Sequence, residues 1–204
     1  MTSLCSQFTL PISTDPNAPS SVKVLLWKLV SITIFPYLPS PLYKLRRIIL
    51  RTFGATMDPH ARVRGGVRIS HPWNLTIGRK SSIGEGTQVY NPAPLTIGDR
   101  SVISQYCYVS CVSSDSSSST SNQLPAPLTI GDDVWIATEC VIEGNQSIPC
   151  GLLVGARSLI SNNYTPEPPP LSPWTIATGH PARSRRDRDY QGIKTGLNMP
   201  GVAV

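Results

Sequence analysis

Residues 130–160 read IGDDVWIATECVIEGNQSIPCGLLVGARSLI and carry an aliphatic side chain at every sixth position. The recurring residues are Ile130, Ile136, Ile142, Ile148, Val154 and Ile160. A period of six matches neither the period of about 3.6 of an α-helix nor the period of about 2 of a strand. It is typical of a hexapeptide repeat, in which three short strands make one triangular turn of a β-helix and point one apolar residue per face inward. The stretch therefore predicts a mainly β fold with a stacked aliphatic core.

The same register extends back to Met57 and predicts about five turns within residues 55–164. The further inward residues are expected to be Met57, Val63, Ile69, Ile77, Ile83, Val89, Ile97, Ile103 and Val109. Glycine often follows the inward residue, as at Gly78 and Gly98, and a residue without a Cβ suits a tight corner.

Three insertions interrupt the ladder. Two extra residues follow Ile69, two follow Val89, and the polar segment 110–127 follows the third turn. Because successive turns stack, all three insertions are expected to leave from one corner of the prism, together with His71 and Asn91. The last insertion is long enough to indicate a functional loop, with a serine-rich linker as the alternative.

The flanking regions have a different composition. Residues 1–20, rich in Ser, Thr and Pro, predict a disordered leader. Residues 21–54 predict two apolar and basic helical segments separated by prolines. These segments either cap the end of the β-helix or, through 21–53, rest on a membrane surface, since neither has the roughly 20 apolar residues needed to span a bilayer. Residues 165–204 predict one closing strand, with Ile176 inward, followed by a basic tail.

Composition narrows the class of protein. The chain has 204 residues, a formal net charge of +6 and five cysteines, none in CxxC spacing. With no cleavable signal pattern, this predicts reduced thiols and a cytoplasmic protein, with a membrane-peripheral location as the second expectation. No metal is expected. Basic charge without a binding motif does not support a nucleic-acid partner.

Several motifs resemble those of one enzyme family. The segments PWNLTIG, PLTIGDR, PLTIGDDVWIATECVI, LLVGARSLIS and WTIATGHPAR are similar to the hexapeptide-repeat O-acetyltransferases, in particular the maltose/galactoside and colanic-acid types. The similarity runs from about Leu25 to Arg186. The resemblance implies a left-handed β-helix that forms a homotrimer with active sites between subunits. It also implies acetyl transfer from acetyl-CoA to a hydroxyl of a sugar or another small molecule.

The resemblance assigns roles by position. Contacts to CoA fall on Trp135, Thr138, Gly155, Ala156, Ser158, Thr178 and Arg183. Tyr90 and Asn91 fall on the acceptor side. In this family a histidine in the long loop removes the proton of the acceptor hydroxyl, a task that suits an imidazole whose pKa lies near neutrality.

The chain departs from the family at that histidine. Ser114 stands in its place, and Asp115 matches the acidic residue that often follows it. A serine is not a base at neutral pH, so the catalytic candidates are Asp115, if burial raises its pKa, Ser114 with help, and His71. His71 shares the corner but lies two turns away, roughly 10 Å along the axis. Asn162 similarly stands where the family has a lysine near the cofactor.

These observations favour an acyl-CoA-dependent O-acyltransferase with an atypical base. The altered loop and the excursion at Pro166–Pro173 favour a specialised small metabolite over a simple sugar. Two alternatives stay open. The first is a catalytically retired scaffold that binds a ligand or partners an active enzyme. The second is a CoA-independent lyase, isomerase or cyclase that uses Asp115, His71 or Tyr106 for acid–base chemistry.

Overall fold

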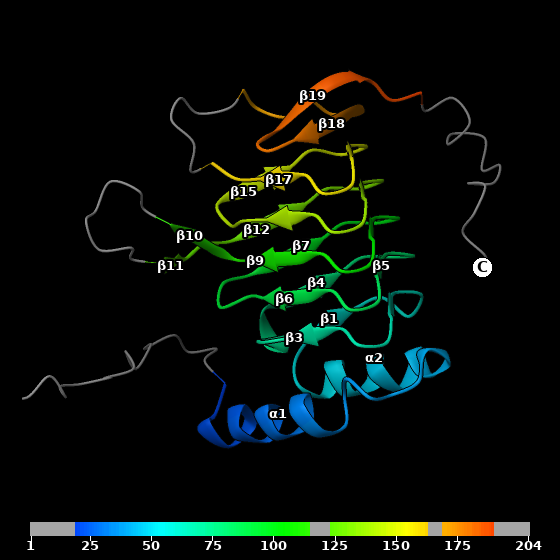
Figure 1. Ribbon diagram of the computed structural model, residues 1–204. Coiled ribbons are helices and arrows are strands. Elements are labelled where there is room, and N and C mark those ends of the chain that lie inside the picture. The colour runs from blue at the N-terminus through cyan, green and yellow to red at the C-terminus, as the bar shows by residue number, and fades with distance from the viewer. Residues whose placement is uncertain (1–18, 115–122, 163–168, 190–204) are drawn as a thin grey trace, which may run out of the picture.

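The computed structural model describes residues 19–114, 123–162 and 169–189 and consists of a three-sided column of short strands closed at one end by helices (Figure 1). The helices at that end are α1 (Ser21–Thr33), η1 (Ser40–Leu42) and α2 (Tyr43–Thr52), and a further 3-10 helix, η2 (Pro72–Asn74), lies between two strands of the column. Within the described ranges, the strands of the column pair in parallel. Antiparallel pairing occurs between β10 (Val112–Ser114) and β11 (Gln123–Pro125) and between β18 (Thr175–Gly179) and β19 (Ala182–Asp187). The predicted mainly β solenoid of about five turns is confirmed. Its left-handedness stays a prediction.

Three sheets form the sides of the column, named here faces A, B and C in the order in which the chain visits them. Face A contains β1 (Thr56–Met57), β4 (Leu75–Ile77), β7 (Leu95–Ile97), β12 (Leu128–Ile130) and β15 (Gln146–Ile148). Face B contains β2 (Arg62–Val63), β5 (Ser82–Ile83), β8 (Val102–Ile103), β13 (Trp135–Ile136), β16 (Leu153–Val154), β18 (Thr175–Gly179) and β19 (Ala182–Asp187). Face C contains β3 (Arg68–Ile69), β6 (Gln88–Tyr90), β9 (Tyr108–Ser110), β14 (Val141–Ile142) and β17 (Leu159–Ile160).

The aliphatic ladder forms the core of the column. Each predicted inward residue from Met57 to Ile160 pairs in register with its equivalent on an adjacent turn. These side chains are at most 4% exposed. Since burial of one aliphatic side chain contributes about 1.5–3 kcal/mol, the ladder is the main source of stability.

A second buried ladder lies at the corners, two residues before each inward residue. At the corner between faces A and B, Ser81 Oγ donates to Gly98 O over 2.5 Å and Ser101 Oγ donates to Gly131 O over 2.6 Å. At the corner between faces B and C, Thr87 Oγ1 donates to Ser104 O, 2.9 Å away. These hydroxyl groups donate hydrogen bonds to corner carbonyl groups, which do not take part in the hydrogen bonds between strands. The equivalent positions are Ala61, Ser81, Ser101, Val134 and Leu152, and Val67, Thr87, Cys107, Cys140 and Ser158.

The helices of residues 21–54 cap one end of the column, which was one of the two arrangements predicted from the sequence. Trp27 of α1 is 2% exposed, and its Nε1 donates to Ile69 O and Ser70 O, each 3.1 Å away. Its ring lies 5.4 Å from that of Phe35 and 5.1 Å from that of Phe53. The aromatic cluster covers the open end of the aliphatic ladder. No helix among the described residues is long and apolar enough to cross a membrane.

The closing strand differs from the sequence prediction by one residue. β18 pairs with β16 so that Ala177, not Ile176, stacks on Val154 and is fully buried. Among the described residues between Ile160 and β18, no strand joins face A, so the hexapeptide spacing no longer sets the register of β18.

The sequence predicted one closing strand, and the structure has a second one after β18, whereas the basic tail stays a prediction. Residues 182–187 form β19, which pairs antiparallel with β18 and covers the edge of face B. Arg188 is 6% exposed, and its Nη1 donates to Asp133 O over 2.8 Å and to Gly151 O over 2.9 Å. The hairpin β18–β19 therefore closes the second end of the column.

Candidate active site

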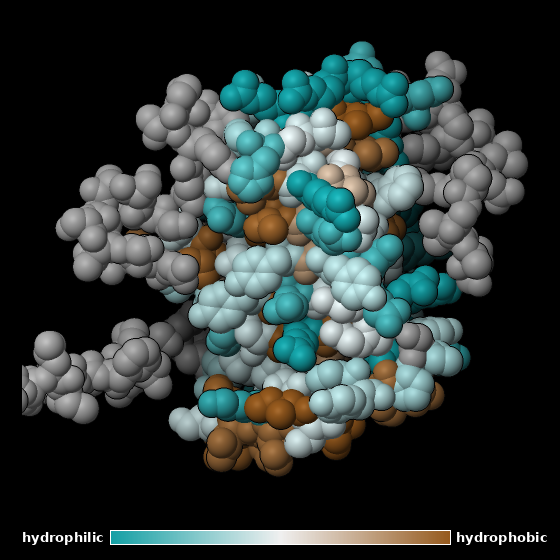
Figure 2. Space-filling view, in the orientation of Figure 1, coloured by the Kyte–Doolittle hydropathy of each residue, from teal (hydrophilic) through white to brown (hydrophobic). Residues whose placement is uncertain are grey.

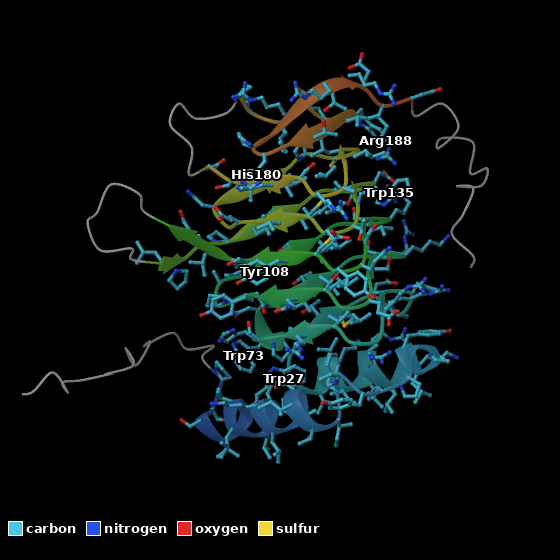
Figure 3. All side chains as sticks on the ribbon, viewed as in Figure 1. Trp27, Trp73, Tyr108, Trp135, His180 and Arg188 are labelled. Carbon is cyan, nitrogen blue, oxygen red and sulfur yellow. The ribbon has the colours of Figure 1, made fainter. Side chains whose placement is uncertain are left out.

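Two corners, one at each edge of face C, contain the residues that the sequence singled out. The insertion corner, between faces C and A, comprises residues 70–74, 91–94, 111–114 and 123–127. The Trp135 corner, between faces B and C, comprises Trp135 and residues 104–107, 137–140 and 155–158. Trp73 of the first corner and Trp135 of the second lie on opposite sides of the column (Figure 3).

The Trp135 corner presents an aromatic ring to solvent. Trp135 precedes an inward isoleucine, so its indole points outward and is 37% exposed. The Nε1 of Trp135 donates to Ser104 Oγ over 3.1 Å. Thr138 Oγ1 donates to Gln105 O, 3.0 Å away. Both side chains are thus held against the preceding turn, which fixes the ring while leaving its face accessible.

Gly155 and Thr178 meet where the fifth turn contacts β18. The backbone N of Gly155 donates to Ala177 O over 2.8 Å, and a Cβ at Gly155 would lie 2.5 Å from Thr178 Cγ2. Close approach therefore requires glycine at this position. Ser158 is 2% exposed, and its Oγ accepts a hydrogen bond from Gly179 N over 3.2 Å, so this hydroxyl holds the β18 backbone.

The remaining CoA candidates, Ala156 and Arg183, are exposed at the same corner, and Arg183 pairs with Thr178 across the hairpin. The structure thus gathers all the residues predicted to contact CoA along one corner, from the fourth turn to the closing hairpin: Trp135, Thr138, Gly155, Ala156, Ser158, Thr178 and Arg183. An exposed indole, small side chains and a cationic end suit an extended phosphorylated ligand. The individual contacts stay predictions.

Cys107 and Cys140 of this corner and Cys111 of the insertion corner are buried. Cys107 and Cys140 are at most 1% exposed, and their thiols donate to Ala137 O and Gly155 O, each 3.1 Å away. A hydrogen bond with Cys140, together with burial, raises the pKa of Cys107. Burial raises the pKa of Cys111 to about 12. Cys107 and Cys111 are therefore protonated near neutral pH and are poor nucleophiles.

The insertion corner is held together by Asn91, which is fully buried. Asn91 Nδ2 donates to His71 O over 2.8 Å, and Asn91 Oδ1 accepts from His71 N over 3.1 Å. Ser70 Oγ accepts from Asn91 N over 2.9 Å and donates to Asn91 Oδ1 over 3.2 Å. The amide of Asn91 therefore joins the first and second turns of the column. Its predicted role on the acceptor side stays a prediction.

His71 is a half-buried imidazole at this corner. Its ring centroid lies 5.3 Å from that of Trp73 and 6.3 Å from that of Tyr90. Burial lowers the pKa of His71, which favours the neutral ring. His71 Nδ1 lies 2.8 Å from Ser70 Oγ. Because that hydroxyl donates to Asn91, we assign the ring proton to Nδ1, which leaves the basic lone pair on Nε2.

The other two catalytic candidates belong to the hairpin of β10 (Val112–Ser114) and β11 (Gln123–Pro125). The backbone of Ser114 pairs with Gln123 at the outer end of this hairpin. Asp115 lies outside the described residues. The strand order β3, β6, β9 puts His71 two strands, roughly 10 Å, from the level at which the hairpin leaves the column. Within one chain, His71 and the start of the hairpin therefore lie at different levels of the column.

A groove of about 640 Å³ runs along face C from α1 toward the insertion corner. Its lining includes Ile32, Tyr37, Arg68, Tyr90 and Tyr108. Tyr90 and Tyr108 are 43% and 41% exposed. Of these residues, Tyr90 alone was predicted from the sequence as a site residue. Arg68 and Tyr108 each precede an inward residue, so strand alternation was the signal that would have found them.

The site contains no candidate metal centre: within the described ranges, no group of three or more His, Cys, Asp or Glu side chains could hold a metal ion.

No protein-family model matches the chain. A candidate colanic acid biosynthesis acetyltransferase, WcaF of Escherichia coli (strain K12), is 34% identical over 169 residues, which cover 83% of this chain and 89% of that protein. The chain belongs to the hexapeptide-repeat acetyltransferase family.

Solved structures share the fold of this hexapeptide-repeat acetyltransferase. A galactoside acetyltransferase in complex with coenzyme A has a TM-score of 0.71 and 22% identity, with 84% of each chain covered. A maltose O-acetyltransferase from Clostridium difficile 630 has a TM-score of 0.69 and 20% identity, with 82% of this chain and 87% of that chain covered. These two matches show the fold, whereas the match to WcaF makes this chain a transferase by family.

Proposed function

We propose that this hexapeptide-repeat acetyltransferase is an acyl-CoA-dependent O-acyltransferase that uses acetyl-CoA as donor. The observation that carries the proposal is the gathering of seven predicted CoA contacts along the Trp135 corner. The coenzyme A in the related galactoside acetyltransferase supports the same donor. The acceptor is a hydroxyl of a sugar or of a specialised small metabolite, held in the groove beside Tyr90 and Tyr108.

The separation of the two corners supports a homotrimer with active sites between subunits. The corners are separated by the width of face C, roughly 13 Å for four residues at about 3.3 Å each. Nucleophilic attack requires the reacting atoms to lie within about 3.5 Å. A neighbouring subunit that sets its Trp135 corner against the insertion corner of the first subunit would bring donor and acceptor together.

The proposed reaction forms one bond and breaks one. The acceptor oxygen attacks the thioester carbonyl carbon while its proton passes to a base, and backbone N–H donors stabilise the oxyanion. The tetrahedral intermediate then collapses, the C–S bond breaks, and the CoA sulfur takes up a proton. The products are the acetyl ester and free CoA.

The base is proposed to come from the insertion corner. His71 is neutral near pH 7, because burial lowers its pKa, and its Nε2 is the basic atom. Asp115, beyond the end of β10, is the other candidate, and Ser114 would assist by hydrogen bonding. Variants His71→Gln and Asp115→Asn, compared at saturating acetyl-CoA, identify the base through kcat, while the affinity for CoA serves as a control because neither residue belongs to the Trp135 corner.

The decisive experiment incubates the purified protein with acetyl-CoA and a panel of saccharides and other alcohols and measures free thiol release. The expected result is turnover with at least one acceptor and its loss in Trp135→Ala. Absence of both CoA binding by calorimetry and turnover would refute the proposal.

Ser114, in place of the family histidine, favours one alternative, a scaffold that binds CoA without turnover. The same experiment separates the two functions. CoA binding without thiol release for any acceptor, followed by a gain of turnover in Ser114→His, would assign the scaffold role.

We further propose a cytoplasmic location. The support is chemical: Cys107, Cys111, Cys140 and Cys150, the cysteines within the described ranges, are all free thiols. Treatment of intact cells with a membrane-impermeant alkylating reagent, quenched before lysis, tests this, since an extracellular protein would be labelled at the exposed Cys150.

A further inference from the structure

The outer side of the helical cap forms a distinct surface, the basal platform. It comprises Val22, Leu25, Leu29 and Ile32 of α1 and Leu45 and Ile48 of α2. In the space-filling view, apolar side chains gather at this end of the molecule (Figure 2). The α1 members are spaced three or four residues apart, so they lie on one side of the helix.

The apolar side chains of the platform are exposed although the same helices already bury another side. Leu25, Leu29 and Ile32 are 69%, 61% and 64% exposed, and Ile48 is 58% exposed. Trp27 is 2% exposed on the opposite side of α1, against the column. Packing against the β-helix therefore explains why the inner side of the cap is apolar, but it does not explain the apolar side chains on the outer side. A contiguous exposed apolar surface of this kind indicates a binding surface.

Charge identifies the kind of partner. Residues 16–57 contain no Asp or Glu, and the cap carries six basic residues: Lys23, Lys28, Lys44, Arg46, Arg47 and Arg51. Of these, Lys28, Lys44 and Arg51 are exposed beside the apolar platform. Apolar side chains bordered by cations, without any acidic residue, complement a bilayer with anionic headgroups. A protein partner or a second copy of the platform would have to accommodate this unopposed positive charge.

The position of the platform agrees with such a partner. The helices lie at the end of the column, and the strands run around its sides (Figure 1). Association of columns side by side would bury faces and corners and leave their ends free. In the trimer proposed above, the three platforms would point in one direction, and simultaneous contact by three sites raises overall affinity without any new contact within a subunit.

We propose that the basal platform docks this enzyme on an anionic membrane surface, with α1 lying in the interface. α1 has 13 residues and is roughly 20 Å long at about 1.5 Å per residue, which is short of the roughly 30 Å hydrocarbon core. Its exposed leucines insert between headgroups, and Lys44 and Arg51 contact lipid phosphates or carboxylates. The attachment is peripheral and weakens with salt, because its electrostatic part is screened.

The experiment is vesicle flotation of the full-length protein. One set of vesicles consists of phosphatidylcholine, and the other contains about 30% phosphatidylglycerol, a content at which the surface potential is strongly negative. The wild-type protein is expected to float with the anionic vesicles at about 0.1 M salt and to lose most of its binding at about 0.5 M. Leu25→Glu/Leu29→Glu is expected to bind at least about tenfold more weakly, a loss of about 1.4 kcal/mol.

A charge-matched pair of variants controls for non-specific attraction. Lys44→Glu/Arg51→Glu changes two exposed cations on the cap, and Arg185→Glu/Arg186→Glu makes the same change on β19 at the other end of the column. The first variant is expected to lose at least about fivefold in binding and the second less than twofold. Circular dichroism melting and light scattering verify that each variant keeps the wild-type fold and assembly.

Three outcomes would overturn the proposal. One is the absence of flotation with either set of vesicles. Another is an equal loss of binding in the two charge variants, which would make the attraction a property of net charge. The third is a doubling of the assembly mass in vesicle-free solution that Leu25→Glu/Leu29→Glu abolishes, which would assign the platform to a second copy. None of these outcomes depends on turnover, so failure of the docking proposal can be distinguished from failure of the proposed acyl transfer.

Discussion

The Trp135 corner and the insertion corner border the same sheet, yet they are built from opposite kinds of sequence. The Trp135 corner keeps the six-residue spacing in every turn, from Val67 to Ser158. The insertion corner departs from that spacing after β3, β6 and β9. A regular corner preserves the position of each side chain relative to the axis, so roles carry over from relatives position by position. Where the chain inserts residues, the backbone path must be set anew, and Ser114 lies in such a segment.

The largest expected effect tests whether the insertion corner is held by a single side chain. Asn91→Leu removes the hydrogen bonds of the buried amide to Ser70 and His71 and leaves backbone groups of the first turn without partners. The free energy of unfolding is expected to fall by about 3 kcal/mol, measured by urea denaturation. The matched control is Asn162→Leu, which removes an exposed amide that donates to Asn145 O over 3.0 Å and should cost less than about 1 kcal/mol. Equal losses of unfolding free energy in the two variants would contradict the conclusion that Asn91 holds the insertion corner together.

A smaller effect separates donor binding from acceptor binding. Trp135→Ala is expected to reduce kcat/KM for acetyl-CoA about 30-fold, since loss of an aromatic anchor costs about 2 kcal/mol. Because the indole is 37% exposed, the melting temperature should change by less than about 3 °C. Tyr108→Ala, at the groove, should instead raise KM for the acceptor and leave the Kd of CoA within about twofold. If Trp135→Ala instead raised KM for the acceptor and Tyr108→Ala weakened CoA binding, the proposed positions of donor and acceptor would be wrong.

The pH dependence of stability tests the burial of His71. Burial lowers the folded-state pKa of His71 below the unfolded value, so the unfolded chain takes up a proton first as the pH falls. Stability is therefore expected to decline as the pH falls below about 6.5, the ordinary pKa of histidine, until the folded-state pKa is passed. Urea denaturation of wild type and His71→Gln between about pH 7 and about pH 5 measures the difference. A steeper decline in His71→Gln would contradict the assignment.

The smallest expected effect concerns the second ladder of the Trp135 corner. Cys107→Ser places a hydroxyl two residues before an inward residue, as Ser101 does at the corner between faces A and B, so the hydrogen bond to Ala137 O should be kept. The free energy of unfolding is expected to change by less than about 1 kcal/mol. Cys107→Leu, which adds volume at the same buried position, should cost about 1–3 kcal/mol. The difference between the two variants reports how tightly the corner is packed.

Most of the fold was predictable because one physical requirement, an inward apolar residue per face, repeats at fixed spacing. That requirement assigned all the inward residues from Met57 to Ile160 and the shared corner of the insertions. It failed at Ile176, because a closing strand that follows a long excursion has no repeat to fix its register. The strand β19 was missed since a strand at the end of the column, exposed along ARSRRD, carries no apolar ladder.

The candidate site was predictable to a smaller extent. The residues assigned to CoA by resemblance lie along the Trp135 corner, because regular spacing stacks successive turns there, and their contacts with CoA stay predictions. The groove beside Tyr108 was missed, since its walls come from α1 and face C, which are distant in sequence. The base was not predictable from Ser114, because proton transfer depends on distances between segments and, in the proposed trimer, between subunits.

Arg188 and the helical cap give the column two differently secured ends. In a stack where each turn contacts only its neighbours, amide hydrogen exchange proceeds from the ends inward. Trp27, Phe35 and Leu50 fill one end, whereas the other end is closed mainly by small residues such as Ala177 and by the hydrogen bonds of Arg188. The amides of β18 and β19 should therefore exchange before those of β1. Since Thr178 and Arg183 lie on that hairpin, acetyl-CoA binding should be visible as slower exchange at the looser end of the protein.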